Sequence, residues 1–158
     1  MTINLNELAR GGTVCLSKAG LIKHTGSVAT ITIAAPNGAG VDFAINGILY
    51  HKADTTNIAL TAAAVQPVLT KCLYAVCLDS SGTLSTVKGT AQLTADLTAG
   101  TKVLAWPTPT VDTCCIGALK IQCAVAATFT AGTTLLDASD LTVTYYDLFA
   151  VPVSPLTS

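Results

Sequence analysis

Short runs in which apolar and polar residues alternate recur along most of the chain, and turn residues separate them. Residues 28–33 read Val-Ala-Thr-Ile-Thr-Ile, a period of two that is typical of a strand with one buried face. Residues 41–45 and 48–52 flank Asn46-Gly47, the pair favoured at the two positive-φ positions of a type I′ turn. These patterns predict a strand followed by a tight β-hairpin.

The second half of the chain carries longer apolar runs. Residues 71–78 are apolar on both faces, which is typical of a strand covered on both sides, and the turn at 79–82 leads into a second hairpin with residues 83–88. Further strands are expected at 102–106, 115–123 and 141–146. About seven to nine short strands predict an all-β fold, an antiparallel β-sandwich or barrel of a jelly-roll-like kind.

Two segments interrupt the strand pattern. Residues 93–100 predict a short helix or turn, with Thr94 as a candidate N-cap and Gly100 just past the end. The Ala-rich residues 57–65 fit a helical turn or a strand, because Ala carries little information inside a packed sheet.

Three parts of the chain differ in character. Residues 28–150 are expected to form one β domain. Residues 1–27 contain interspersed Gly and Lys, so we expect an extended N-terminal arm or a short strand pair there, with an ordinary first strand at 13–16 as the alternative. Residues 151–158, which include two prolines, are expected to form an extended and exposed C-terminal tail.

Charged residues are scarce. The 158 residues include 8 Lys or Arg and 9 Asp or Glu, for a formal net charge of −1, whereas Thr and Ala together supply about 31%. The charged fraction of 11% is less than half of the roughly 25% of an ordinary domain. Low charge density and near-zero net charge favour association, so we expect this protein to pack against its own copies or a partner.

The same composition argues against two kinds of ligand. The basic residues are scattered singly, with Arg10 as the one arginine, so no stripe is available to neutralise nucleic-acid phosphates. Apolar runs stay well below the roughly 18 residues of a membrane-spanning helix, so no membrane partner is expected. The first ten residues lack a cationic leader and an apolar run, which predicts maturation in the cytosol.

Six Cys and two His are the candidate metal ligands. A cytosolic protein of this length does not need disulfides, so we expect free and mostly buried thiols. Cys72 and Cys77 are an odd number of residues apart on one predicted strand and should point to opposite faces. A zinc site that combines His24 and His51 with some of the Cys is a minor alternative; we predict no metal and no cofactor.

The acidic residues do not indicate catalysis. Asp79 precedes Ser80-Ser81-Gly82, and Asp137 and Asp140 flank a short turn, positions where carboxylates usually bond to local backbone. The chain contains no Gly-x-Ser-x-Gly elbow, no Gly-x-Gly-x-x-Gly loop and no Walker-type lysine. We therefore do not expect an enzyme.

Large aromatic side chains are the strongest candidates for contacts with a partner, because each ring buries a large area. Trp106 stands beside Pro107, and Tyr145 and Tyr146 are adjacent on a predicted strand, so one of the two tyrosine rings must face outward.

Several segments resemble structural proteins of tailed bacteriophages. They are residues 48–61 (Ile-Leu-Tyr-His-Lys-Ala-Asp-Thr-Thr-Asn-Ile-Ala-Leu-Thr), 72–74, 79–84 and 129–135, within a likeness that spans roughly residues 41–150. Chains of that group resemble head decoration (cement) and head-fibre proteins, which sit on an assembled capsid, commonly as trimers.

The resemblance implies a virion structural protein, made in the host cytoplasm, that binds the outer capsid surface and stabilises the head as a homotrimer. Its partners would be the major capsid protein and its own copies. The expected capsid or subunit contacts are Leu5, Leu8, Arg10, Trp106, Tyr145 and Tyr146.

Three alternatives stay open. A tail or fibre component that binds a host-surface glycan should have aromatic residues along an exposed groove, with Asp or Asn beside them. A bacterial surface-layer or adhesin module would need export, and an enzyme with a dispersed site would need a pair of acids in a pocket.

Overall fold

The structure is a computed structural model and describes residues 12–26, 28–149 and 151. Its helices are short, η1 (Pro36–Gly38) and α2 (Thr94–Thr98). The described strands are β1 (Val14–Cys15), β2 (Leu21–Lys23), β3 (Thr30–Ile33), β4 (Val41–Ile45), β5 (Ile48–Lys52), β6 (Thr55–Ala59), β7 (Thr70–Asp79), β8 (Leu84–Lys88), β9 (Gln92–Leu93), β10 (Thr113–Cys123) and β11 (Leu141–Asp147).

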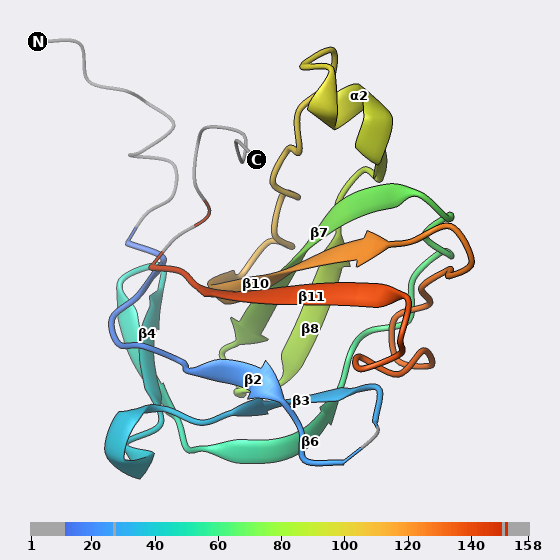
Figure 1. Cartoon of the computed structure of the whole chain (residues 1–158). Helices are drawn as coiled ribbons and strands as arrows, with labels where there is room; N and C mark the ends of the chain where they lie inside the picture. Colours follow the sequence, from blue (N-terminus) through green and yellow to red (C-terminus); the bar gives the residue numbers. More distant parts are fainter. Residues whose placement is uncertain (1–11, 27, 150, 152–158) are drawn as a thin grey trace, which may run out of the picture.

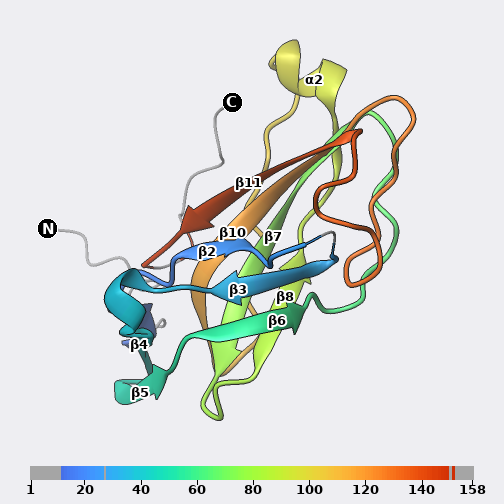
Figure 2. The ribbon, with the colours of Figure 1, turned by 60° about the horizontal axis from the view of Figure 1, so that its bottom comes forward.

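These strands form three antiparallel sheets. The central sheet has the order β11-β10-β7-β8, with β9 paired to β7, and the two small sheets have the orders β1-β4-β5 and β2-β3-β6. Figures 1 and 2 show the small sheets on the same side of the central sheet. The predicted all-β antiparallel sandwich is confirmed, and the strands of the described part do not close into a barrel.

The main core lies between the central sheet and the two small sheets, and we call this side of the central sheet the inner face. Ile31, Ile33 and Phe43 from the small sheets pack there against Tyr74 of β7, and all four are almost fully buried. The Phe129 ring meets the Tyr74 ring edge-on, with 5.5 Å between centroids. This face holds most of the buried apolar area that drives folding.

One buried polar side chain joins the loops to this core. Gln66 is fully buried, and its Nε2 donates to the carbonyl oxygens of Thr70 at 3.2 Å and Ile121 at 3.0 Å. Its Oε1 accepts from the Tyr74 hydroxyl at 3.2 Å, and its backbone pairs with Phe129. The loop before β7 is thus fixed by hydrogen bonds that a burial pattern alone does not reveal.

A bulge in β10 changes which side chains face the core. The register with β7 shifts between Cys115 and Gly117, so Cys114 faces inward before the shift, Ile116 faces inward at the bulge and Leu119 faces inward after it. A Cβ on Gly117 would lie 2.3 Å from the Leu21 side chain of β2 and 2.5 Å from the Tyr146 carbonyl oxygen. The glycine therefore lets a small sheet pack closely on β10.

The other side of the central sheet, its outer face, is covered by irregular chain instead of a sheet. Leu97 and Leu104 bury Leu73 there, with Trp106 packed against them. Figure 1 shows α2 and the chain after it on this side, away from β2, β3 and β6. A second outer cluster, described below, contains Cys77 and Cys115.

Both predicted hairpins are confirmed. Ile45 pairs with Ile48 across a turn in which Asn46 (φ 52°) and Gly47 (φ 81°) both have positive φ, as a type I′ turn requires. The second hairpin pairs Leu78 with Leu84. The strands expected at 28–33, 115–123 and 141–146 are β3, β10 and β11.

Two local predictions need correction, and one open alternative is decided. Residues 102–106 form no strand, because they cross the outer face, where Leu104 packs on Leu73. Thr94 is the first residue of α2 and not its N-cap, which is Leu93, although Gly100 follows the helix with the expected positive φ of 70°. The Ala-rich segment resolves into β6 and an irregular stretch at 60–65.

The predicted boundary of the N-terminal arm is also corrected. Within residues 12–26, β1 pairs with β4 and β2 pairs with β3, and Cys15, Ala19 and Leu21 are buried in the main core. This stretch belongs to the sandwich, as the alternatives of a first strand and a strand pair had it, because its apolar side chains fill the core. Residues 1–11 and 152–158 lie outside the described residues.

Candidate functional site

The predicted contact residues fall in different places. Leu5, Leu8 and Arg10 lie outside the described residues. Trp106 and Tyr146 meet on the outer face, with ring centroids 6.2 Å apart and the rings nearly perpendicular. Both side chains are half-buried, and Trp106 also lines a depression of about 380 Å³ beside Lys88 and Gly89. Their contact with a partner stays a prediction.

Tyr145 points the other way, so the predicted split between the two neighbouring tyrosines is confirmed. Its ring packs against the main core. Its hydroxyl is buried and has no hydrogen-bond partner within the described part of the chain. Burial raises the pKa of Tyr145 to about 12, with a smaller contribution from the nearby Asp137 carboxylate. The structure thus gives Tyr145 a place in the core.

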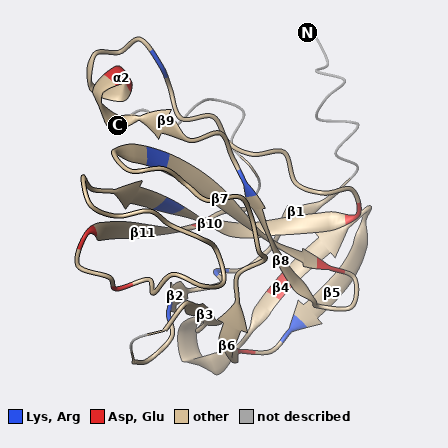
Figure 3. Cartoon of the chain, turned by 90° about the vertical axis from the view of Figure 1, so that its right-hand side faces the viewer, with Lys and Arg blue, Asp and Glu red and all other residues tan. Residues whose placement is uncertain are grey.

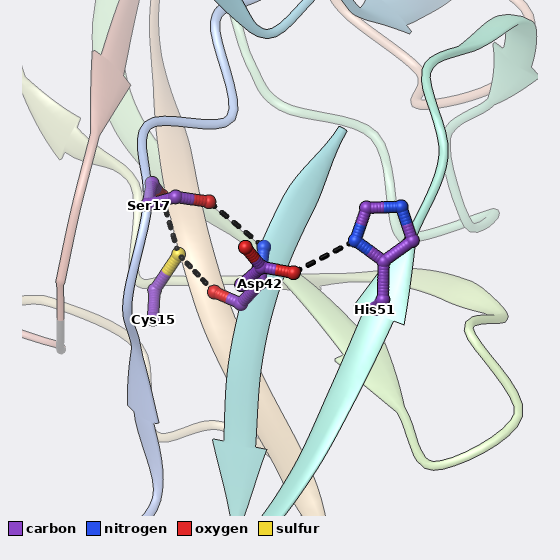
Figure 4. Close-up of polar contacts among 4 residues, drawn as sticks. All are labelled: Cys15, Ser17, Asp42 and His51. Atoms are coloured by element: carbon purple, nitrogen blue, oxygen red, sulfur yellow. Dashed lines mark hydrogen bonds and ion pairs between the residues drawn. The ribbon is translucent and has the colours of Figure 1, made fainter. Parts of the chain in front are cut away.

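A polar cluster on the β1-β4-β5 sheet contains the residue types of a nucleophilic site, but not its geometry (Figure 4). Asp42 Oδ1 lies 2.7 Å from His51 Nδ1, and both side chains are more than half exposed. Ser17 Oγ instead accepts from the Asp42 backbone N–H, at 2.8 Å. Figure 4 shows Ser17 and Cys15 on the side of Asp42 away from His51. No hydroxyl or thiol of this group is activated by the imidazole.

Cys15 of this cluster is also a poor nucleophile. Its thiol is buried and donates to the Ser17 carbonyl oxygen at 3.0 Å, and burial raises its pKa. Burial likewise raises the pKa of Cys72 to about 11 and that of Cys114 to about 12. The prediction of buried, free thiols is confirmed for all six Cys.

A pocket of about 320 Å³ opens at one end of the sandwich, which we call the pocket end. Several chain segments meet there: the Asn46 amide nitrogen donates to Asp112 Oδ1 at 2.9 Å, and the Asn46 backbone N–H donates to the Thr13 hydroxyl at 3.0 Å. The described lining residues are Thr13, Asn46, Thr108, Pro109, Thr110, Val111, Asp112, Thr113, Cys115, Phe149 and Val151.

Large apolar side chains surround this pocket and point to solvent. Val111 and Phe149, both lining residues, are 83% and 68% exposed. Ile48 and Leu49 follow the Asn46-Gly47 turn directly, and Leu49 is 71% exposed. Such a concentration of exposed apolar side chains usually marks a binding surface.

The opposite end of β10 carries a second group of exposed apolar residues, which we call the loop end. Leu69 and Val125 lie in neighbouring loops, since the Leu69 N–H donates to the Ala124 carbonyl oxygen at 3.3 Å. Leu93 joins them through the bond from Thr94 N–H to the Leu69 carbonyl oxygen at 2.8 Å. Leu69 has φ 56°, an uncommon conformation for a bulky side chain.

Charged groups are scattered over the surface (Figure 3). Lys23 pairs with Asp137 at 2.8 Å and Lys18 with Asp147 at 3.6 Å, both at the surface, where such pairs contribute little stability. Among residues 12–26, 28–149 and 151, no three His, Cys, Asp or Glu side chains converge to hold a metal ion. The described part also contains no helix long and apolar enough to cross a membrane.

Sequence reasoning missed the pocket end as a site. The Asn46-Gly47 turn is a local signal that predicts its hairpin correctly, but nothing local links it to Asp112 or Phe149. Asp112 itself has φ 58°, a conformation that Asp tolerates better than most residues. A polar residue after the Pro107–Pro109 stretch is the one sequence feature that could have drawn attention to this loop.

The chain matches no protein-family model, no curated protein and no solved structure at a significant level. Functional assignment therefore depends on the geometry of the described residues and on the sequence resemblance.

Proposed function

We propose that this chain is a structural protein of a tailed-bacteriophage virion, a decoration or cement protein. In this proposal it is made in the host cytoplasm, binds the outer surface of the assembled head and stabilises it as a homotrimer. Its partners are the major capsid protein and its own copies, and it carries out no catalysis.

The observation that carries the proposal is the pair of apolar ends on a weakly charged sandwich. β10 runs from Thr113 at the pocket end to Cys123 at the loop end, and 11 strand residues span about 36 Å. Ile48, Leu49, Val111 and Phe149 at one end and Val68, Leu69, Leu93 and Val125 at the other are exposed. A module with two separated apolar surfaces suits a protein that joins neighbouring subunits.

The pocket end is the better candidate for contact with the head. Gly12, the first described residue, accepts a hydrogen bond from Gly47 N–H at this end, and the proposal takes Leu5, Leu8 and Arg10 of the preceding segment as head contacts. Repeated modest contacts from three copies would raise avidity without a tight single contact.

The test is to measure assembly and head binding together. Light scattering after size-exclusion chromatography should give three times the 16.0 kDa chain mass, and the protein should co-sediment with expanded heads that lack it, up to a saturating stoichiometry. A stable monomer that does not sediment with the heads would overturn the proposal.

Two exposed leucines provide matched variants. Leu49→Asp at the pocket end should weaken head binding at least tenfold without unfolding the protein, because it places a charge in the contact surface. Leu69→Asp at the loop end should weaken head binding less than Leu49→Asp does, because it leaves the pocket-end surface intact. Equal affinity of both variants and the wild type for heads would contradict the assignment of the pocket end.

A second candidate is a tail or fibre component that binds a host-surface glycan, and the pocket favours it. Phe149, Asn46 and Asp112 combine an exposed aromatic ring with amide and carboxylate groups, the arrangement expected for sugar binding. Binding of host glycans on an array, lost in Phe149→Ala and in Asp112→Ala, with no binding to heads, would establish this candidate instead.

A further inference from the structure

Cys77 and Cys115 face each other across the two central strands. They are register partners in the β7–β10 pair, and both are buried in an outer-face cluster with Ala75. The Cys115 thiol donates to the Gly117 carbonyl oxygen at 3.3 Å. Val87, Leu148 and Val151 pack around them.

The pairing of two directly opposed residues in an antiparallel sheet suits a disulfide. Directly opposed residues of an antiparallel pair have Cα atoms roughly 4.5–5.5 Å apart, and disulfides span roughly 4.4–6.8 Å between Cα atoms. A bond between the two sulfur atoms therefore needs side-chain rotation and little backbone movement.

No other thiol in the described strands has such a partner. Cys15 is opposite Phe43, Cys72 opposite Ile121, Cys114 opposite Leu78, and Cys123 opposite Leu141. The bulge after Cys115 contributes to this arrangement, because Cys115 points outward while the adjacent Cys114 points into the main core.

The pair is reachable from solvent on one side. Cys115 is 5% exposed and lines the pocket at the pocket end, whereas Cys77 is completely buried behind it. A pocket of about 320 Å³ admits a small reagent such as hydrogen peroxide. The four other thiols are not among the described lining residues.

The two thiols differ in their ease of ionisation. The adjacent Cys115 side chain lowers the pKa of Cys77, and the Thr113 side chain adds to this effect against the opposing effect of burial. The pKa of Cys115 is raised, first by the Cys77 side chain and then by burial. Cys77 is therefore the member of the pair that ionises more readily, and a thiolate is the form that attacks an oxidised partner sulfur.

We propose that Cys77 and Cys115 form a redox-active dithiol, which a peroxide entering the pocket converts to a cross-strand disulfide. The Cys115 sulfur, which lines the pocket, first attacks one peroxide oxygen, the O–O bond breaks, and a sulfenic acid and water result. The Cys77 sulfur then attacks the Cys115 sulfur, the S–O bond breaks, and the hydroxyl group leaves as water with the Cys77 proton.

The oxidation needs no reactant besides the two thiols and the peroxide. Two thiols and one hydrogen peroxide give one disulfide and two waters; the thiols lose two electrons and the peroxide gains them. This site does not depend on the proposed virion function.

The first test uses the intact, folded protein. After treatment with hydrogen peroxide and then denaturation, the count of free thiols should fall from six to four. The mass should fall by about 2 Da through loss of two hydrogens, and a non-reducing digest should contain one peptide pair linked through Cys77 and Cys115. Dithiothreitol should restore all six thiols.

Variants separate this pair from the other thiols. Cys77→Ala and Cys115→Ala should form no disulfide, while Cys72→Ala, on the opposite face of β7, should still lose two thiols. Phenylarsine oxide, which needs two adjacent thiols, should bind the folded wild type and Cys72→Ala but neither single variant of the pair. This reagent tests the pair even if peroxide acts slowly.

Three results would overturn the proposal. They are an unchanged thiol count in the folded wild type, a disulfide that maps to other Cys, and addition of oxygen to Cys115 with no link to Cys77. Because the wild-type experiment requires no substitution, a variant that fails to fold does not change what that experiment decides.

Discussion

The two faces of the central sheet are covered by different means. Two small sheets seal the inner face, where Tyr74, Phe129 and Phe43 are almost fully buried. On the outer face, irregular chain lies over Leu73 and over the Cys77–Cys115 pair, and the half-buried Trp106 and Tyr146 form its aromatic contact.

Because of this difference, the residues that contribute most to stability and the candidate binding and redox residues lie on different faces of the central sheet. Ordered sheets on the inner face give dense packing, which stabilises the fold. The looser cover of the outer face leaves the pocket, the reachable thiol of Cys115 and the exposed Phe149. Candidate binding and redox sites therefore lie where the sheet is covered by loops.

The largest expected effect comes from the inner face. Phe129→Ala should lower the free energy of unfolding by about 3–5 kcal/mol, because it removes a fully buried ring and its edge contact with Tyr74. Chemical denaturation would measure this loss. The matched control is Phe149→Ala, whose ring is exposed and whose loss should cost less than about 0.5 kcal/mol. Equal losses would refute the contrast between the two regions.

A smaller effect is expected on the outer face. Trp106→Ala should cost about 1–2 kcal/mol, less than a fully buried ring, because Trp106 is half-buried and packs on Leu73, Leu97 and Leu104 from one side. Trp106→Phe should recover most of this loss in the same denaturation experiment. A loss from Trp106→Ala as large as that from Phe129→Ala would mean that the outer cover is part of the main core.

The smallest effect concerns the hydroxyl of Tyr145 on the inner face. Tyr145→Phe should change stability by less than about 1 kcal/mol at neutral pH, because the buried hydroxyl lacks a hydrogen-bond partner among the described residues. Thermal unfolding at pH 7 would measure this. A loss of several kcal/mol would indicate that the hydroxyl has a partner.

The same residue should make stability depend on alkaline pH. The folded-state pKa of Tyr145 is raised from 10.0 to about 12, so the unfolded chain releases the proton first. The contribution of Tyr145 to the free energy of unfolding should therefore be constant below pH 10 and fall as pH rises from 10 to 12. The free energy of unfolding of Tyr145→Phe should fall less steeply over this range. An identical slope in both proteins would contradict a raised pKa of Tyr145.

Local patterns were enough to predict much of the fold. The Asn46-Gly47 turn specifies a hairpin through its two positive-φ positions, and the doubly apolar residues 71–78 specify a central strand. Strand alternation correctly separated Tyr145 from Tyr146 and Cys72 from Cys77. These predictions succeed because turn chemistry and the two-residue period act within a few neighbouring residues.

Other features were decided by contacts between distant segments. Residues 102–106 have a strand-like composition, yet they lie across a sheet face. Neither the pocket that joins Asn46 to Asp112 nor the pairing of Cys77 with Cys115 is visible in any local window. The register of β7 against β10, including the bulge at Cys115, fixes that pair, and register follows from packing of the whole sheet against its neighbours.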